Sequence, residues 1–555
     1  MKKFEFKFYH WEKNTPDAPF LRQPFGDKWE VYSWKEAGQM ARKVATGLHS
    51  FGLPPKSHIG LVSKNCREWV IADIAIMMAG YVSVPFYPTL KAEAVGQLIE
   101  AGDVKALFAG KLDDWEGMKD GVPEGMPVIR FPHYKGCSEV KEGVDWFEFM
   151  DQFEPMEGEP AAELDDIWTI VFTSGTTGTP KGVVLTYEAL ESTKQVIEDN
   201  NHLQVSLEGD NTFFSFLPLN HIAERVVVEN TCLKYGGVIS FAESLETFAK
   251  NLQETQPSLF FAVPRIWTKF QLGVLAKMPQ KRLDLLLSLP IISGVVKKKL
   301  KAGLGMTNVR GCLTGAASIP ESTKNWFRRL DIPIAEGYGM TENCALCSCL
   351  EAKDVLPGSV GKALPGATIR IHPESGEILM KAPYLMRGYY KDAEKTAETI
   401  QDGWLHTGDQ GRIDDNGNLF ITGRVKDTFK TAKGKFIAPA PIEWHFAQDA
   451  DIEQICILGL GCPQPVALVV PSEIGLAKPQ ETLKAGLQST LQEVNKQLPN
   501  YQKVSTIIVA KDAWSIENGC LTPTLKVKRN VLGQRYKDLL MSWHEDKEMV
   551  LWEQN

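Results

Sequence analysis

A segment rich in glycine, serine and threonine, TSGTTGTPKGV at residues 173–183, directly follows an apolar run at residues 167–172. This order predicts a buried strand that ends in a tight loop. Glycines let the backbone approach a ligand and point N–H groups at it, hydroxyl groups add donors, and Lys181 adds a positive charge. A surface hairpin is the alternative, but a turn needs fewer small and hydroxyl residues. We therefore expect a phosphate-binding loop, although its spelling is not that of a Walker P-loop, in which Ser or Thr follows the lysine.

The size and charge of the chain limit its architecture and its partners. Its 555 residues are too many for one hydrophobic core and suggest several structural units. The net charge of −8 and the sequence pI near 5.8 give no global positive field. No arginine-rich or zinc-finger module appears either, so we expect no nucleic acid among the partners.

Neither a secretory signal nor a membrane span is expected. The N-terminal MKKFEFKFYH alternates phenylalanine with charged residues and lacks the unbroken apolar core of a signal. The longest apolar stretch, residues 70–86, contains Asp73, Gly80 and Pro85 and is shorter than the ~20 residues of a membrane span. A buried helix followed by a strand is the better interpretation. We expect a cytoplasmic protein.

The cysteines give no sign of a disulfide framework or a metal centre. Ten cysteines are scattered without paired spacing, as expected for a reducing compartment. Cys344, Cys347 and Cys349 are close together, but no second C-x-x-C and no His pair lies near them in the sequence. Ordinary buried thiols are the favoured interpretation.

Apolar runs alternate with helical patterns along the chain, which predicts an α/β fold with layered sheets and helices. The runs at residues 167–172, 212–217 and 309–313 read as strands, and residues 188–198 and 321–330 read as helices. A boundary is expected near residues 424–427. The predicted organisation is a large N-terminal domain of several subdomains (1–423), a hinge (424–427) and a small mobile C-terminal α+β lid (428–555).

One segment departs from this pattern. Within residues 281–306 a leucine-rich half, LDLLLSLPII, precedes a lysine-rich half, VVKKKLK. The plainer interpretation is a helical hairpin broken at Pro290, with its lysines in solvent. The alternative is a basic amphipathic element that lies on an anionic membrane surface, which would place the protein peripherally on the inner face of the membrane.

Several further motifs follow in a recognisable order. Together with the glycine-rich loop they resemble the adenylate-forming superfamily of acyl-CoA synthetases, luciferases and nonribosomal adenylation domains. The spelling is most similar to that of AMP-forming long-chain fatty acyl-CoA synthetases. The matching segments are FLPLNHIAER (216–225), VPRIW (263–267), LTGAA (313–317), EGYGMTE (336–342), GWLHTGD (403–409), TGRVKD (422–427) and LTPTLKVKR (521–529).

The resemblance implies a nucleotide site assembled from these motifs. The loop would hold the β- and γ-phosphates, the wall at 314–317 would lie against adenine, and Tyr338 would stack on it. Asp409 and Arg424 would hold the ribose. The implied ATP- and AMP-binding residues are Thr173, Ser174, Gly175, Thr176, Thr177, Gly178, Lys181, Thr314, Gly315, Ala316, Ala317, Glu336, Gly337, Tyr338, Gly339, Asp409 and Arg424.

Lys526 is the catalytic residue that the resemblance implies most directly. It matches the lysine that swings over the active site and bridges the substrate carboxylate and the α-phosphate. A compact, movable ammonium group suits that role. Lys528 and Arg529 lie close enough for the assignment to slip, and by itself a KVKR string reads as a solvated basic end.

Three further catalytic roles are implied. Thr341 would donate a hydrogen bond to the α-phosphate, and Glu342 with Thr177 would hold Mg²⁺ through oxygen ligands. His221 matches a position beside the substrate carboxylate, although a lone histidine is more often structural. ATP and coenzyme A are the implied co-substrates.

The second half-reaction requires the lid to reorient. Lys426 matches the pivot of the family, and Lys433, Gly434 and Lys435 match the loop that then faces the coenzyme A tunnel, with a less secure alignment there. Gly434 would leave the channel open because it has no side chain. Trp267 matches an aromatic gate of the acyl tunnel, whereas a lone tryptophan is normally core.

The implied reaction is the activation of a medium- or long-chain fatty acid as its coenzyme A thioester. The rival enzyme is a fatty acyl-AMP ligase that hands the acyl group to a carrier protein, but no carrier domain is seen. A catalytically silent lipid-binding relative is a second alternative. Retention of the implied catalytic residues disfavours it, since a binding module needs none of them. The patterns leave open whether the chain forms a homodimer or makes weak membrane contact.

Overall fold

Eight strands form the sheet that carries the glycine-rich loop. The computed structural model describes residues 2–173, 180–515, 518–522 and 526–553. β8 (Ile167–Thr173) and β9 (Lys181–Thr186) pair antiparallel, so the strand predicted at residues 167–172 is confirmed. The order is β19-β9-β8-β4-β3-β5-β6-β7. The other strands are β3 (His58–Ser63), β4 (Val82–Phe86), β5 (Val104–Gly110), β6 (Val128–Arg130), β7 (Val144–Asp145) and β19 (Gly388–Tyr389).

A nine-stranded sheet brings the LTGAA and EGYGMTE motifs to one edge. Its order is β16-β15-β14-β13-β12-β10-β11-β1-β2, and the strands from β14 to β1 run parallel. Carboxyl ends of parallel strands form the usual ligand edge of such a sheet. The strands are β1 (Pro19–Phe25), β2 (Lys28–Ser33), β10 (Thr212–Ser215), β11 (Val238–Phe241), β12 (Leu259–Phe261), β13 (Gly311–Thr314), β14 (Ile334–Tyr338), β15 (Ser348–Leu350) and β16 (Lys362–Ala363).

Helix α3 (Arg67–Met78) explains the longest apolar stretch. Every residue of α3 is buried, and the helix contacts β1 of the nine-stranded sheet and β3 and β4 of the eight-stranded sheet. A helix that is buried on every side needs such a position between layers. The predicted buried helix and following strand are confirmed. Within the described ranges, no helix is long and apolar enough to cross a membrane.

A third sheet of five strands lies between these layers and the hinge. It contains β17 (Thr368–Ile371), β18 (Glu377–Lys381), β20 (Ile400–Gln401), β21 (Trp404–Ile413) and β22 (Leu419–Arg424). The helices of the large domain are α1 (Phe8–Asn14), α2 (Trp34–Ser50), α4 (Ala92–Ala101), α5 (Trp146–Asp151), α6 (Tyr187–Ser192), α7 (Gln195–Glu198), α8 (Ile222–Glu224), α9 (Thr231–Tyr235), α10 (Phe248–Thr255), α11 (Pro264–Lys277), α12 (Gln280–Ser288), α13 (Pro290–Gly303), α14 (Glu321–Arg328) and α15 (Ala393–Thr399), with one-turn and π segments η1 (Lys119–Gly121), η2 (Arg225–Asn230) and η3 (Thr341–Asn343).

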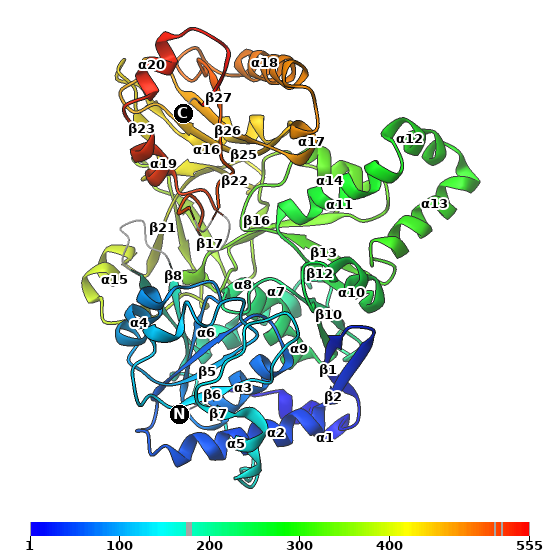
Figure 1. Cartoon of the computed structure of the whole chain (residues 1–555), viewed down its shortest axis with the longest axis vertical. Coiled ribbons are helices and arrows are strands. Elements are labelled where there is room, and N and C mark those ends of the chain that lie inside the picture. Colours follow the sequence, from blue (N-terminus) through cyan, green and yellow to red (C-terminus); the bar gives the residue numbers. More distant parts are fainter. Residues whose placement is uncertain (1, 174–179, 516–517, 523–525, 554–555) are drawn as a thin grey trace.

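The C-terminal lid stands above the large domain (Figure 1) and is built on its own sheet, β25-β26-β27-β28. Alternate side chains of its strands enter two separate apolar clusters, one on each face. The predicted large α/β domain with a smaller C-terminal α+β domain is confirmed. The lid elements are β23 (Phe429–Lys430), β24 (Phe436–Ile437), α16 (Pro439–Phe446), β25 (Ile452–Leu458), β26 (Val466–Pro471), α17 (Glu473–Leu476), α18 (Gln480–Gln497), β27 (Ile507–Val509), α19 (Arg529–Arg535), α20 (Leu540–Glu545) and β28 (Val550–Trp552).

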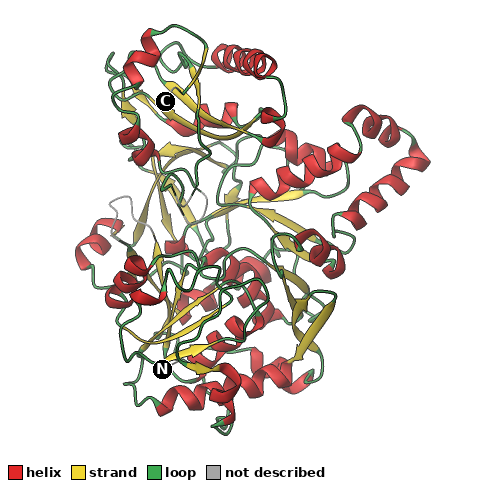
Figure 2. Ribbon diagram, viewed as in Figure 1, coloured by secondary structure: helices red, strands yellow, loops and turns green. Residues whose placement is uncertain are grey.

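Helices α12 and α13 form a hairpin that projects from the side of the large domain (Figure 2). The chain turns at Leu289, and Pro290 takes the first position of α13, where its missing N–H costs nothing. The helical hairpin predicted to break at this proline is therefore confirmed.

Candidate active site

The β8–β9 hairpin places both ends of the glycine-rich loop. Thr173 is the last residue of β8 and lies opposite Lys181, the first residue of β9. The Lys181 Nζ lies 5.7 Å from the centre of the Tyr389 ring. Burial lowers the pKa of Lys181, and so do Lys395 and Lys426, whereas Asp392 and Glu342 act in the opposite direction. The expected phosphate ligands Ser174, Gly175, Thr176, Thr177 and Gly178 lie outside the described residues.

Strands β13 and β14 bring LTGAA and EGYG together. Thr314 lies opposite Glu336 in the parallel pair. A Cβ on Gly315 would meet the Gly337 carbonyl at 3.0 Å, so the two strand ends approach each other closely. Beyond them, Ala316 has a left-handed φ of 66°, and Ala316 and Ala317 are exposed. These small residues leave an open surface at the end of the sheet.

The next residues of EGYGMTE form a tight turn. A Cβ on Gly339 would lie 2.1 Å from the Ala345 backbone, which only glycine avoids. Thr341 then begins the one-turn helix η3. Glu336 points elsewhere, because its carboxylate accepts a 2.8 Å hydrogen bond from Lys324 on α14. The Glu336 side chain therefore stabilises this end of the sheet, and a contact with the nucleotide would be made by the Glu336 backbone.

A hydrogen-bonded row joins the aromatic and ribose-binding candidates. The Tyr338 hydroxyl donates to Asp409 Oδ2 at 2.7 Å, and Arg424 Nε lies 3.0 Å from Asp409 Oδ1. The register of β21 and β22 sets this row, because Asp409 pairs directly with Arg424. Burial and the charge of Asp409 raise the pKa of Tyr338 well above its usual value, so the phenol stays protonated and donating.

Glu342 is a buried carboxylate in this same region. Its Oε1 accepts a 2.8 Å hydrogen bond from the Tyr389 hydroxyl. Burial raises the pKa of Glu342, Asp409 raises it further, and Lys181 opposes the shift. A nearby cation would favour the ionised form. Tyr389 was missed in the sequence, since its motif carries no special spelling and its place follows only from the pairing of β19 with β9.

Lys526 reaches this region from the lid. The residue keeps solvent-exposed surface, but its ammonium group is desolvated. That desolvation and then the charge of Arg424 lower its pKa, while Asp409 and Glu342 raise it. The lid therefore holds this ammonium within electrostatic range of three residues of the large domain.

His221 is also within electrostatic range of Lys526. It caps the N-terminus of α8, where its Nδ1 accepts a hydrogen bond from Ala223 N at 3.3 Å. Burial and then the charge of Lys526 lower the pKa of His221 to about 4. The imidazole is therefore neutral at pH 7, and because Nδ1 is an acceptor, its proton is on Nε2. A substrate carboxylate could accept a hydrogen bond from that proton.

The residues expected to form the hinge and the coenzyme A loop precede and begin the C-terminal domain. Asp427 contacts the C-terminal domain through Arg529, whose Nε lies 3.5 Å from Asp427 Oδ2, and the expected pivot Lys426 directly precedes it. Gly434 has a left-handed φ of 75° in the turn between β23 and β24. Lys433, Gly434 and Lys435 are all exposed and turned to solvent.

Trp267 lies in the core and not at an opening. It is 0% exposed, its Nε1 donates to the Ala262 carbonyl, and its ring packs edge-on against Phe260 and Phe327 at 5.3 and 5.1 Å. Trp267 was expected to be a tunnel gate, but its contacts in the structure are those of a packed aromatic cluster. The physical reason is its position on the inner face of α11.

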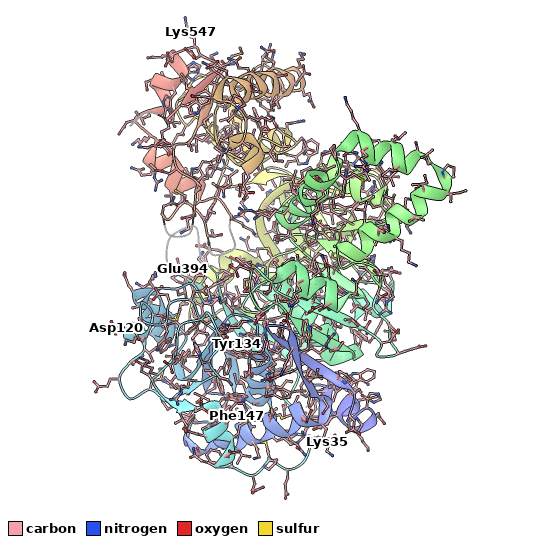
Figure 3. All side chains as sticks on the ribbon, turned by 45° about the vertical axis from the view of Figure 1, so that its right-hand side comes forward. Lys35, Asp120, Tyr134, Phe147, Glu394 and Lys547 are labelled. Carbon is pink, nitrogen blue, oxygen red and sulfur yellow. The ribbon has the colours of Figure 1, made fainter. Side chains whose placement is uncertain are left out.

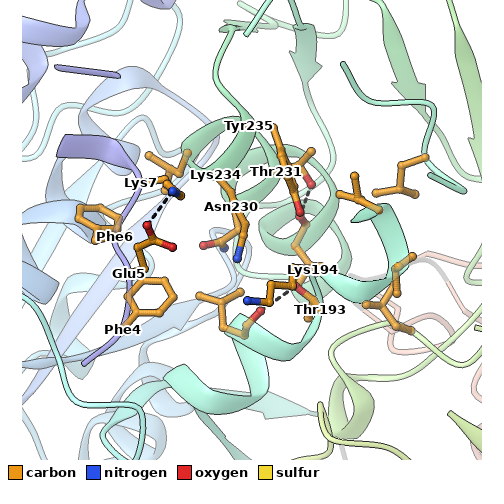
Figure 4. A pocket seen from close by; sticks show the side chains of 17 residues that line it. Phe4, Glu5, Phe6, Lys7, Thr193, Lys194, Asn230, Thr231, Lys234 and Tyr235 are labelled. Atoms are coloured by element: carbon orange, nitrogen blue, oxygen red, sulfur yellow. Dashed lines mark hydrogen bonds and ion pairs between the residues drawn. The ribbon is translucent and has the colours of Figure 1, made fainter. Parts of the chain in front are cut away.

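A mostly apolar pocket lies between the N-terminal segment and the helical turns that follow α8 (Figure 4). The π-helical segment η2 and α9 contribute Val226, Asn230 and Leu233 to its wall, and Leu346 closes it near EGYGMTE. π-helical turns inside helices often accompany functional sites. At ~1.5 Å per residue, these wall residues lie about 8 to 18 Å beyond His221 along the helix.

Comparison with known proteins gives the class to which this arrangement belongs. The AMP-binding enzyme family matches residues 8–390, and the AMP-binding enzyme C-terminal domain matches residues 426–548. The chain belongs to the AMP-binding enzyme family, and its resemblance to adenylate-forming enzymes is confirmed.

Two relatives and one solved structure are similar to the chain over most of its length. The Xenopus laevis long-chain-fatty-acid–CoA ligase ACSBG2 is 30% identical, over 96% of this chain and 82% of that protein. The Rattus norvegicus long-chain-fatty-acid–CoA ligase 5 is also 30% identical, over 95% and 85%. Among solved structures, the anthranilate CoA ligase AuaEII with anthranoyl-AMP has a TM-score of 0.76 at 19% identity, covering 96% of this chain and 98% of its own. The similarity to this solved structure shows the fold of the chain.

Proposed function

We propose that this protein is an AMP-forming long-chain fatty acid–CoA ligase. One observation carries the proposal: Tyr338, Asp409 and Arg424 form a hydrogen-bonded row, and Lys526 of the C-terminal domain lies within electrostatic range of it. A binding protein has no need of this convergence of charges from two domains. The relatives named as long-chain-fatty-acid–CoA ligases support the same substrate class.

In the first half-reaction a carboxylate oxygen of the fatty acid attacks the α-phosphorus of ATP. The bond to the pyrophosphate oxygen breaks, and acyl-AMP and pyrophosphate form. Lys526 bridges the carboxylate and the α-phosphate, and its positive charge offsets the negative charge that meets there. The neutral His221 donates from Nε2 to the carboxylate without protonating it. The Tyr338–Asp409–Arg424 row holds the nucleoside.

Magnesium is the metal that this chemistry implies. The described residues contain no cluster of three or more acidic, cysteine or histidine ligands, so a cage made by protein alone is not formed there. A lone buried carboxylate, Glu342, fits a Mg²⁺ ion that keeps phosphate oxygens and water as its other ligands. When bound, Mg²⁺ neutralises phosphate charge. We propose Glu342 and Thr177 as its protein ligands.

The second half-reaction transfers the acyl group to the thiol of coenzyme A and releases AMP. We assign rotation to residues 424–427 with Lys426 as the pivot, and the thiol path to the turn that contains Lys433, Gly434 and Lys435. The acyl chain is assigned to the pocket that Figure 4 shows. The ten free cysteines suit a cytoplasmic enzyme.

The decisive experiment incubates the purified protein with ATP, Mg²⁺, coenzyme A and saturated acids from acetate to palmitate. Acyl-CoA and AMP should form together, with activity that rises with chain length because each buried methylene contributes about 0.8 kcal/mol. Acyl-AMP that accumulates without thioester would indicate the acyl-AMP ligase. Binding of fatty acid without AMP formation would indicate a silent relative.

A further inference from the structure

The tip of the α12–α13 hairpin exposes a concentrated apolar surface. Of 21 exposed large hydrophobic residues in the described chain, five fall within the eleven residues from 285 to 295. The exposed fractions reach 88% for Ile291 and 62% for Leu285. Single exposed apolar residues need no explanation, but a cluster at the end of a projection does. The five are Leu285, Leu289, Ile291, Ile292 and Val295.

The same hairpin is basic although the chain is acidic. From residue 280 to 303 it contains six lysine or arginine residues and one acid, for a net charge of +5, against −8 for the whole chain. The acid, Asp284, is paired with Arg329 at 2.6 Å, and Lys297 is paired with Asp331 at 2.8 Å. Lys298 and Lys299 are exposed, and neither takes part in an ion pair among the described residues.

The helical repeat places these groups in order along one face of α13. Ile291, Val295 and Lys299 are spaced four residues apart, and Lys298 lies seven residues after Ile291, so all share the outward face. On the inward face, Val296 and Leu300 pack against the core of the large domain. The apolar residues therefore lead, and the two lysines follow about 10 to 12 Å behind Ile291 at the tip, at ~1.5 Å per residue.

This order of apolar and basic groups matches the cross-section of a lipid surface. Interfacial helices bury an apolar face about 5 to 10 Å deep at the boundary between headgroups and acyl chains, and lysines extend to the phosphates. A protein interface of standard size covers about 800 Å² of each partner, which a narrow two-helix tip is poorly shaped to offer. Figure 3 shows the hairpin at the outer edge of the molecule also after a 45° turn, so the tip can approach a plane.

We infer that the α12–α13 tip docks on an anionic lipid bilayer, with Leu285, Leu289, Ile291, Ile292 and Val295 inserted and with Lys298 and Lys299 at the lipid phosphates. The inference concerns where the protein works and does not depend on which acid it activates. Its immediate consequence is access to fatty acids dissolved in the membrane, because the docking element follows directly on α11 in the same lobe.

The test is vesicle co-sedimentation of the full chain at low salt, with phosphatidylcholine vesicles that contain or lack phosphatidylglycerol. Lys298→Gln with Lys299→Gln should weaken binding to the anionic vesicles about 25-fold, since each charge near the surface contributes about fivefold. Ile291→Ser with Ile292→Ser and Val295→Ser should weaken it at least about tenfold. The matched control, Lys537→Gln with Lys547→Gln, removes two exposed lysines of the lid and should bind like the unchanged protein. Lys547 lies at the far end of the lid (Figure 3).

Three results would overturn the inference. One is the absence of binding to anionic vesicles, another is equal binding to both vesicle types, and the third is binding by the hairpin variants that equals the control. Loss of a dimer in the serine variant, without vesicle binding by the unchanged protein, would assign the tip to a second copy instead. Pyrophosphate release with octanoate in solution should be unchanged in every variant, which verifies that each one folds.

Discussion

Replacing Lys526 with alanine tests the two-domain site at its centre. The substitution removes one ammonium group and leaves the large-domain partners in place. The positive charge that acts on Asp409 and Glu342 is then lost, and the incoming carboxylate and α-phosphate lose the cation between them. Loss of one well-placed electrostatic donor in a desolvated site costs about 10²- to 10³-fold in rate, or about 3 to 4 kcal/mol. Adenylation should fall by that factor.

The pH dependence of adenylation supplies a second measure of the same residue. Desolvation and Arg424 lower the pKa of Lys526 from its ordinary value of 10.5. Adenylation needs the charged form, so its rate should fall as pH rises through this lowered pKa. Thioester formation from supplied acyl-AMP should not show the same limb, because the lysine has left the site by then.

The assays separate the half-reactions. Pyrophosphate release from fatty acid and ATP reports adenylation, and acyl-CoA formation from supplied acyl-AMP reports thiol transfer. Lys528→Ala is the matched control, since it removes a lysine two residues away that follows the same strand pairing. Equal losses in both half-reactions, or a larger effect of Lys528→Ala, would refute the assignment of Lys526.

Three other substitutions address the lid and the core. Gly434→Leu should block thioester formation and leave adenylation unchanged. Gly461→Leu, at another glycine of the lid with a left-handed backbone, is the control and should leave both half-reactions unchanged. Equal loss of both half-reactions in Gly434→Leu would contradict the tunnel assignment. Arg265→Ala should slow adenylation at most about fivefold, because its ion pair with Glu453 across the domains is partly exposed and contributes up to about 1 kcal/mol, and a tenfold loss would contradict this reading. Trp267→Ala should lower the free energy of unfolding by about 3 to 5 kcal/mol in urea titration, as for a core aromatic residue. A changed dependence of activity on acyl chain length, at an unchanged free energy of unfolding, would instead support the role of Trp267 as a gate.

Local patterns in the sequence were sufficient for the elements that hold the site. The strand before the glycine-rich loop, the buried helix before β4 and the hairpin break at Pro290 each follow from composition and spacing. The helix predicted at residues 188–198 is two short helices instead. Thr193 Oγ1 donates to the Leu190 carbonyl at 2.7 Å, and such side-chain bonds compete with helix continuation.

Contacts between distant segments could not be predicted in this way. The hydrogen bond from Tyr389 to Glu342 depends on the pairing of β19 with β9, strands some 200 residues apart in the chain. The inward turn of Glu336 depends on Lys324 of α14. The residues next to Tyr389 and Glu336 in the sequence do not indicate these contacts, because the order of the strands and the placement of the helices decide what each side chain contacts.

The architecture of the C-terminal domain supports the two lid positions that we propose. Leu521 and Val527, which flank Lys526, pack on one face of the lid sheet, and Ile437, which follows the turn containing Gly434, packs on the other. Side chains on opposite faces of one sheet point in opposite directions, so a rigid lid cannot present both elements to the large domain at once. The structure has Lys526 in the site and the Gly434 turn exposed to solvent. The contact of Asp427 with Arg529 places the C-terminal end of the hinge that we propose, residues 424–427, at Asp427.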